Sequence, residues 1–152
     1  GPWGRPDMAP ILFTDAILSG KPIKVFNKGD LLRDFTYIDD IVEGVLRVLN
    51  KAATIDPGFS GRKPNPASSS APYRVLNIGN SQPTPLLKFI ETLEEALGMQ
   101  AQREFLPMQP GDVYATSADT SELNAWVGFK PSTPLEKGVA AFVHWYREFY
   151  RR

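Results

Sequence analysis

The sequence predicts an α/β protein, in which a small mixed sheet packs with several helices. Apolar residues recur at helical spacing in long segments of the chain. Between these segments lie short runs of β-branched and aromatic residues, which favour strands. Glycine and proline punctuate the runs, so the strands are expected to be short and few. No internal repeat is visible.

Composition narrows the class of protein. The chain has 152 residues, of which 42% are hydrophobic and 22% charged, enough for one domain-sized unit with a real core. Its formal net charge is zero, without the basic excess of a nucleic-acid binder. No apolar run approaches the roughly 18 residues of a membrane span. Cysteine is absent, which is typical of a reducing compartment. We expect a cytoplasmic protein with neither nucleic acid nor membrane as partner.

The first elements follow from these patterns. Residues 1–7 are rich in glycine and proline and are expected to form an extended loop. A helix then ends at Gly20. Strands are expected at 23–25 and 35–37, with a turn at 27–30 between them. The inner face of the helix is expected to be Ile11, Leu12, Ala16 and Ile17.

The middle of the chain changes character after a second helix. Asp39 or Asp40 is expected to cap this helix, which runs to about Asn50. Residues 52–72 are rich in proline and serine, have no periodicity, and predict an exposed loop of a composition typical of disorder. The inner face of the helix is expected to be Ile41, Val42, Val45, Leu46 and Leu49.

The second half predicts strands at 73–78 and 102–106 and helices at 83–97, 120–127 and from Pro134 onward. Asp119 is expected to cap the short helix. Such a sheet is too small to cover every helix, so we expect another domain to cover part of the surface. The inner faces of the two longer helices are expected to be Leu86, Phe89, Ile90, Leu93 and Leu97, and Val139, Phe142, Val143 and Tyr146.

Arg33 is the strongest candidate for a binding residue. It stands before the β-favouring run Phe35–Ile38, and the planar fork of an arginine matches two phosphate oxygens at once. Phe26, Phe35 and Tyr37 are candidates to flank a planar base. The alternative is a structural ion pair between Arg33 and one of the nearby acids, which are Asp34, Asp39 and Asp40.

Four motifs carry a resemblance. GPWGRPDM at 1–8, RDFTYIDD at 33–40, LNIGN at 76–80 and MQPGDV at 108–113 resemble the C-terminal part of extended short-chain dehydrogenase/reductase nucleotide-sugar epimerases. Within that group the chain is most similar to the UDP-glucuronate 4-epimerase family. The resemblance covers residues 1–152 and implies the C-terminal, UDP-sugar-binding subdomain of an enzyme whose Rossmann half is absent from this chain. It also implies that the intact enzyme is a homodimer, with an interface built mainly by the absent half.

The cofactor and the chemistry are expected in that absent half. No G-x-G-x-x-G or G-x-x-G-x-x-G turn occurs in the sequence. None of the five tyrosines is followed by a lysine four residues later, as the family's catalytic pair requires. The resemblance therefore implies that the missing N-terminal half binds NAD and that this chain alone is inactive. In the intact enzyme, NAD would take and return the C4 hydride while UDP-glucuronate and UDP-galacturonate interconvert.

The resemblance also assigns residues to the nucleotide end of the ligand. Arg33 is implied to contact the diphosphate. The strand edge formed by Lys24, Val25 and Phe26 is implied to lie against the uracil, with Phe26 either stacking on it or serving as a core aromatic. Arg5 is implied to face the diphosphate or the sugar carboxylate, and is otherwise a surface arginine.

The MQPGDV segment supplies the remaining candidates. Gln109 stands where many epimerases have a phosphate-binding arginine, so one charged contact is weakened or moved here. Asp112 is implied to accept the ribose hydroxyls, and the alternative is a simple turn aspartate. Thr116 is expected near the ribose. No metal site or catalytic triad can be assembled, and the lone histidine, His144, is expected to be structural.

The sequence is also compatible with two other kinds of function. One alternative is a related epimerase, dehydratase or decarboxylase that acts on a different nucleotide-sugar, because the choice of sugar depends largely on the absent half. The other is a non-catalytic nucleotide-binding or interaction module.

Overall fold

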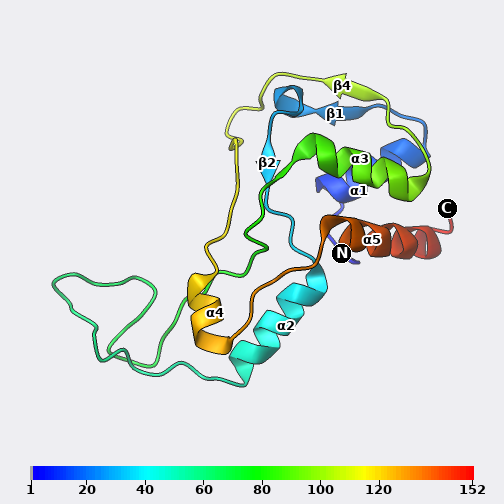
Figure 1. Ribbon diagram of the computed structural model, residues 1–152. Helices are drawn as coiled ribbons and strands as arrows, with labels where there is room; N and C mark the ends of the chain where they lie inside the picture. The colour runs from blue at the N-terminus through cyan, green and yellow to red at the C-terminus, as the bar shows by residue number, and fades with distance from the viewer. Residues whose placement is uncertain (1) are drawn as a thin grey trace.

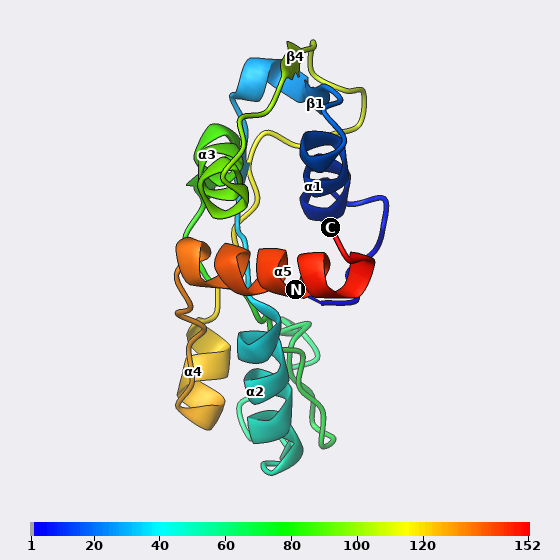
Figure 2. The ribbon, with the colours of Figure 1, turned by 90° about the vertical axis from the view of Figure 1, so that its right-hand side faces the viewer.

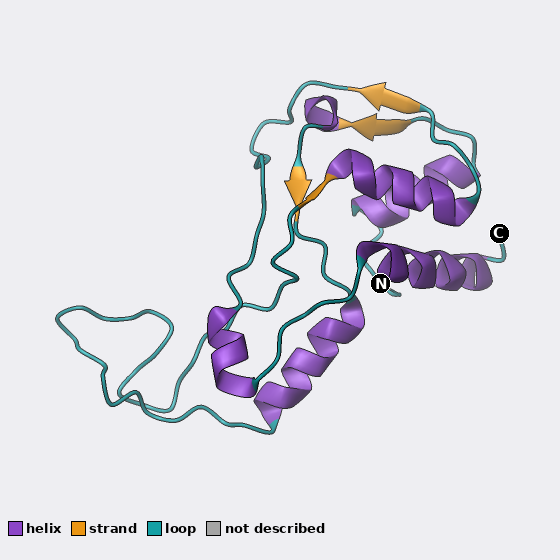
Figure 3. Cartoon of the chain, in the orientation of Figure 1, coloured by secondary structure: helices purple, strands orange, loops and turns teal. Residues whose placement is uncertain are grey.

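The computed structural model describes residues 2–152, which form five α-helices and four short strands (Figures 1 and 3). In chain order the elements are α1 (Ala9–Leu18), β1 (Ile23–Val25), the 3₁₀ turn η1 (Phe26–Gly29), β2 (Leu32–Arg33), α2 (Ile38–Leu49), β3 (Thr84–Pro85), α3 (Leu86–Leu97), β4 (Arg103–Phe105), α4 (Ser121–Val127) and α5 (Leu135–Tyr150). The predicted α/β class is confirmed.

The strands form two separate pairs. β1 lies parallel to β4, and β2 lies antiparallel to β3. In Figure 1, α1 and α3 lie below the β1–β4 pair, whereas α2, α4 and the long loop form the opposite end of the molecule. Figure 2 shows α5 crossing between these two groups. No helix in the described part of the chain is long and apolar enough to cross a membrane.

The main core lies between α1, β1, α3 and α5. The expected inner residues of α3 and α5 are all buried, as their spacing predicted. In α1, Ile11 and Ile17 are buried, but Leu12 is 51% exposed, so its predicted place on the inner face was wrong. α1 packs on this core and is followed along the chain by β1, which lies at the top of the molecule in Figure 1.

The expected strand at 35–37 is absent, although its residues favour strands. Phe35 stacks on Phe89 of α3, with ring centroids 4.5 Å apart, and so joins the core instead of flanking a base. Tyr37 lies against α5, where a Cβ on Gly138 would come within 3.1 Å of its ring. The paired residues are instead Leu32 and Arg33, because β3 lies beside them. Packing therefore overrides local propensity here.

The second helix forms as expected, but its predicted cap and inner face were wrong. Tyr37 occupies the N-cap position, while the carboxylate of Asp40 accepts the N–H groups of Ser132 and Thr133. Only Gly44 in this helix is buried. Ile41 is half-buried, and the exposed apolar side chains of α2 are Ile38, Val42, Val45, Leu46 and Leu49.

Residues 52–83 contain no helix and no strand beyond one isolated bridge, between Ser68 and Arg74. The loop has internal order, since the Asp56 carboxylate accepts the hydroxyl of Ser68 at 2.6 Å and the N–H of Gly58 at 2.9 Å. The prediction of a strand at 73–78 was wrong. The residues of this segment favour a strand, but no strand of the described chain lies beside it.

Candidate functional site

Two segments far apart in the sequence run side by side and carry most of the candidate residues. The N–H of Leu106 donates to the carbonyl of Val25, and the N–H of Lys28 donates to the carbonyl of Leu106. Further along, Leu32 exchanges backbone hydrogen bonds with Tyr114 and Thr116. The stretch 23–33 is thus lined by the stretch 103–116. Of the residues that the resemblance assigns to the ligand, all except Arg5 lie on these two segments.

Arg33 is held in place from several sides. Its Nη1 donates to the carbonyls of Leu32 at 2.8 Å and Tyr114 at 3.1 Å, and its Nη2 donates to Asp112 Oδ1 at 2.8 Å. The side chains of Arg33 and Asp112 are 22% and 32% exposed. The arginine therefore pairs with another candidate ligand residue, and not with Asp34, Asp39 or Asp40.

Asp34, which the sequence analysis did not single out, fixes the surroundings of Arg33. Its Oδ2 accepts the N–H groups of Ser81 at 3.0 Å and Ala118 at 3.1 Å. Its own N–H donates to Thr116 Oγ1 at 3.0 Å, which explains where Thr116 lies. Gly79 is required at this junction, because a Cβ there would lie 2.4 Å from that of Ala118. These contacts join segments 47 and 84 residues away from Asp34.

The β1 candidates differ in exposure. Val25 is fully buried, Lys24 is exposed, and Phe26 is half-buried at the start of η1. Within the described chain β1 pairs with β4 on one side only, so its other edge forms no hydrogen bonds with a strand. Asn27 and Lys28 follow with φ of 49° and 53°, a left-handed conformation that is costly for residues other than glycine.

Gln109 and Arg5 are both exposed. Gln109 begins a turn in which its carbonyl accepts the N–H of Asp112 at 3.1 Å. Arg5 pairs with Asp7 in the N-terminal loop, and no hydrogen bond joins it to the other candidates. The resemblance-based prediction for Arg5 is therefore not supported by a contact within the described chain.

A further polar contact borders the site. The hydroxyl of Tyr114 donates to Asp30 Oδ1 at 3.1 Å, and this hydrogen bond raises the pKa of the tyrosine. The pair ties the 103–116 segment to the end of η1. Nothing in the local spacing could have revealed it, because the two residues are 84 positions apart.

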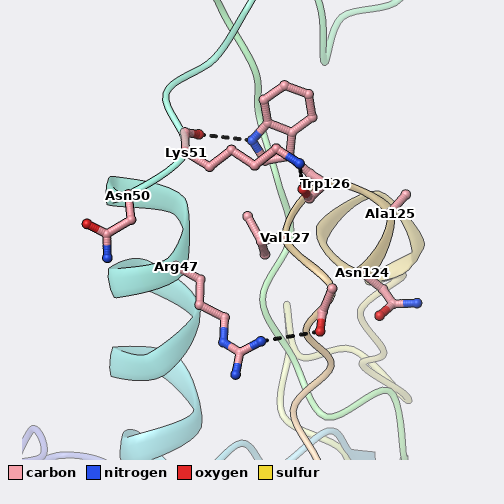
Figure 4. Close-up of a pocket in the computed structure, with 8 residues that line it drawn as sticks. Arg47, Asn50, Lys51, Asn124, Ala125, Trp126 and Val127 are labelled. Carbon is pink, nitrogen blue, oxygen red and sulfur yellow. Dashed lines mark hydrogen bonds between the residues drawn. The ribbon is translucent and has the colours of Figure 1, made fainter.

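A separate cavity lies away from these two segments, between α2 and α4. A groove of about 440 Å³ separates α2 from α4, and Figure 4 shows Arg47 and Lys51 reaching across it. Arg47 donates to the carbonyl of Gly128, and Lys51 donates to that of Trp126. Both carbonyls lie at the C-terminal end of α4, where the helix dipole is negative and cations stabilise it. Because Glu43 also pairs with Arg47, the groove has a structural explanation.

A smaller cavity of about 110 Å³ is lined mainly by apolar side chains, including Phe35, Tyr37 and Phe142. Within residues 2–152, no group of His, Cys, Asp or Glu is arranged to hold a metal ion.

Comparison with known proteins decides the family. The NAD dependent epimerase/dehydratase family model matches residues 1–79, which is more than half of the chain. The chain belongs to this family. The resemblance to uronate epimerases is likewise confirmed by its relatives: the chain is 48% identical to a probable UDP-glucuronate 4-epimerase of Rhizobium meliloti, over its whole length, and 47% identical to protein CapI of Staphylococcus aureus.

Solved structures agree with this assignment. A UDP-glucuronic acid 4-epimerase from Bacillus cereus, in complex with UDP-glucuronic acid and NAD, matches 99% of the chain with a TM-score of 0.79 and 30% identity. The chain covers only 43% of that protein, and 45% and 46% of the Rhizobium and Staphylococcus relatives. It therefore spans a little under half of the length of these epimerase-family proteins.

Proposed function

We propose that this chain is the C-terminal, UDP-anchoring part of an NAD-dependent UDP-glucuronate 4-epimerase. The observation that carries the proposal is the convergence of Lys24, Arg33, Asp112 and Thr116 on two adjoining segments. A guanidinium suits the diphosphate, and a carboxylate suits the paired hydroxyls of ribose. During epimerisation the sugar must turn, so the anchor has to hold the nucleotide firmly and the sugar loosely.

The described residues do not fit the cofactor itself. A dinucleotide site needs a strand followed by a glycine-rich turn and a helix N-terminus. Here β1 is followed by Phe26, Asn27 and Lys28, which belong to a 3₁₀ turn. We therefore propose that NAD and the proton-transfer residues belong to an N-terminal Rossmann half, and we derive no chemical step from this chain.

The surface of α2 supports the proposal of a second half. Val42 and Val45 are about half exposed and Leu49 is 75% exposed, and with Ile38 they form one helical stripe. A contiguous apolar stripe of this kind usually marks an interface. The nearby segment 73–78 consists of strand formers without a strand partner, as expected for a strand whose neighbours lie in another domain. By family resemblance we also propose a cytoplasmic homodimer.

The proposal is tested with a full-length enzyme that carries this sequence. Incubation with UDP-glucuronate should yield UDP-galacturonate, as followed by NMR of the sugar protons. A dehydrated or decarboxylated product would favour the related enzymes instead. Arg33→Ala should raise the KM for UDP-glucuronate about 10-fold to 100-fold, because hydrogen bonds to charged groups contribute roughly 1.5–3 kcal/mol. The exposed Arg62→Ala is the matched control, and an unchanged KM in Arg33→Ala would remove Arg33 from the site.

A further inference from the structure

An aromatic clamp, formed by Trp3, Trp145 and Phe149, joins the start of the chain to the last helix. The ring of Trp3 meets Phe149 edge to face, with centroids 4.8 Å apart, and meets Trp145 at 5.6 Å. Both partners lie on α5, where Trp145 stacks on Phe149 and packs against the main core. Figures 1 and 2 show the start of the chain beside this helix. Because edge-to-face contacts have a preferred geometry, the clamp fixes both position and orientation.

The loop that precedes α1 has few other contacts to hold it. Within the described chain, no hydrogen bond joins residues 2–7 to a helix, a strand or another loop. The guanidinium of Arg5 pairs with Asp7 inside this loop, and both side chains are largely exposed. Gly4 separates Arg5 from the clamp and adds backbone freedom. The place of Arg5 therefore depends on the ring of Trp3.

The backbone of Trp3 is strained, and stability does not explain why. Its φ of 61° is a left-handed conformation that is unusual for a bulky side chain. Such a conformation persists where the surrounding contacts impose it, and it is found most often at functional sites. Trp3 remains 75% exposed, so its contact with α5 removes little apolar surface from water. A strained contact that buries so little is better explained by the loop that it positions.

We propose that Trp3 is a positioning residue, which holds the loop 2–8 against α5 so that Arg5 faces the carboxylate of the bound nucleotide-sugar. This inference rests on the proposed function. A guanidinium binds a carboxylate through two parallel hydrogen bonds, and this geometry tolerates little displacement. The exposed pair with Asp7 is weak and leaves Arg5 available. Loss of the clamp therefore weakens the contact with the sugar and leaves the nucleotide anchor around Arg33 intact.

The experiment compares ligands with and without the carboxylate, on a full-length enzyme that carries this sequence. Trp3→Ala should raise the KM for UDP-glucuronate about tenfold, the effect of losing one hydrogen-bonded contact between charged groups. The dissociation constants of UDP and of UDP-glucose, measured by calorimetry, should stay within about twofold, because neither ligand has the carboxylate. Trp3→Phe keeps an aromatic edge against α5 and should restore most of the lost affinity. Phe149→Ala removes the other side of the clamp and should raise the KM in the same way.

Two further variants make the test specific. Tyr150→Ala removes an aromatic ring from the same end of α5, and within residues 2–152 that ring makes no ring contact with Trp3, so the KM should not change. In an Arg5→Ala background, Trp3→Ala should raise the KM no further, because the clamp acts through that arginine. An unchanged KM in Trp3→Ala, or equal weakening of UDP, UDP-glucose and UDP-glucuronate, overturns the positioning role. If the unaltered enzyme does not convert UDP-glucuronate, the proposed function itself is wrong, which is a separate outcome.

Discussion

Removal of the Asp34 carboxylate should loosen the framework around Arg33. Asp34 Oδ2 accepts the N–H groups of Ser81 and Ala118, and Oδ1 accepts that of Gln82 at 3.3 Å. Asp34→Asn can keep its oxygen toward Ser81 and Ala118, and places an NH₂ group against the weaker contact. Asp34→Ala loses every one of these acceptors and leaves half-buried N–H groups without partners.

The expected losses follow from these contacts. Hydrogen bonds to a charged group contribute about 1.5–3 kcal/mol each, and partial exposure reduces the sum. We expect a loss in the free energy of unfolding of about 1.5 kcal/mol for Asp34→Asn and about 4 kcal/mol for Asp34→Ala. For a chain of this size, 1 kcal/mol shifts Tm by roughly 2–4 °C. Asp34→Ala should therefore lower Tm by about 8–16 °C.

The assay is thermal and urea unfolding of the 152-residue chain, followed by circular dichroism. Asp30→Ala is the matched control, since Asp30 is also an acid in this region, but within residues 2–152 its carboxylate accepts only the exposed hydroxyl of Tyr114. Asp30→Ala should lower the free energy of unfolding by less than about 1 kcal/mol. Equal destabilisation by Asp34→Ala and Asp30→Ala would refute the role of Asp34 as the junction between these segments.

Three other perturbations have defined outcomes. Val45→Asp should change the Tm of this chain by less than about 2 °C, but should destabilise a full-length enzyme by about 2 kcal/mol if another half covers α2; equal effects in the two proteins would contradict that cover. Glu94→Ala should lower the free energy of unfolding, measured in urea, by about 3 kcal/mol, because the Glu94 carboxylate is 4% exposed and accepts hydrogen bonds from Arg103 and from the N–H of Ala101. A loss below about 1 kcal/mol would refute this role of Glu94. The hydrogen bond from Ser68 holds the pKa of Asp56 below its usual 3.8, so the loop contact is present above that pH and is lost as the pH falls through the lower, folded-state pKa. Amide exchange at Gly58, corrected for its intrinsic pH dependence, should therefore rise in acid, and Asp56→Ala, which removes both acceptor oxygens, should show the same rise at neutral pH.

The comparison of α2 with α3 shows what the sequence can reveal. Both have a clear apolar stripe, but only the stripe of α3 is covered by this chain. Spacing identifies an apolar face, and cannot identify which molecule or domain covers it. The same reason explains segment 73–78, whose residues favour a strand that has no neighbour here.

The candidate site was predictable only in part. Arg33 and Asp112 could be named from their motifs, yet their contact joins positions 79 residues apart and no local pattern encodes it. Asp34 was named only as a possible partner of Arg33, and its role at the junction between three segments was missed for the same reason. Phe35 was expected in a strand and as a candidate to flank a planar base, whereas its packing on Phe89 decides its position.

The central claim is that the segments 23–33 and 103–116 anchor the UDP part of a nucleotide-sugar. The most direct test is an NMR titration of the isotope-labelled chain with UDP, a method that detects even weak binding. The account predicts saturable shifts at the amides of Lys24 to Phe26, at Arg33 and from Gln109 to Thr116, with none at Arg47 or Trp126. Shifts confined to the groove between α2 and α4, or no shifts in a full-length enzyme that turns over UDP-glucuronate, would contradict it.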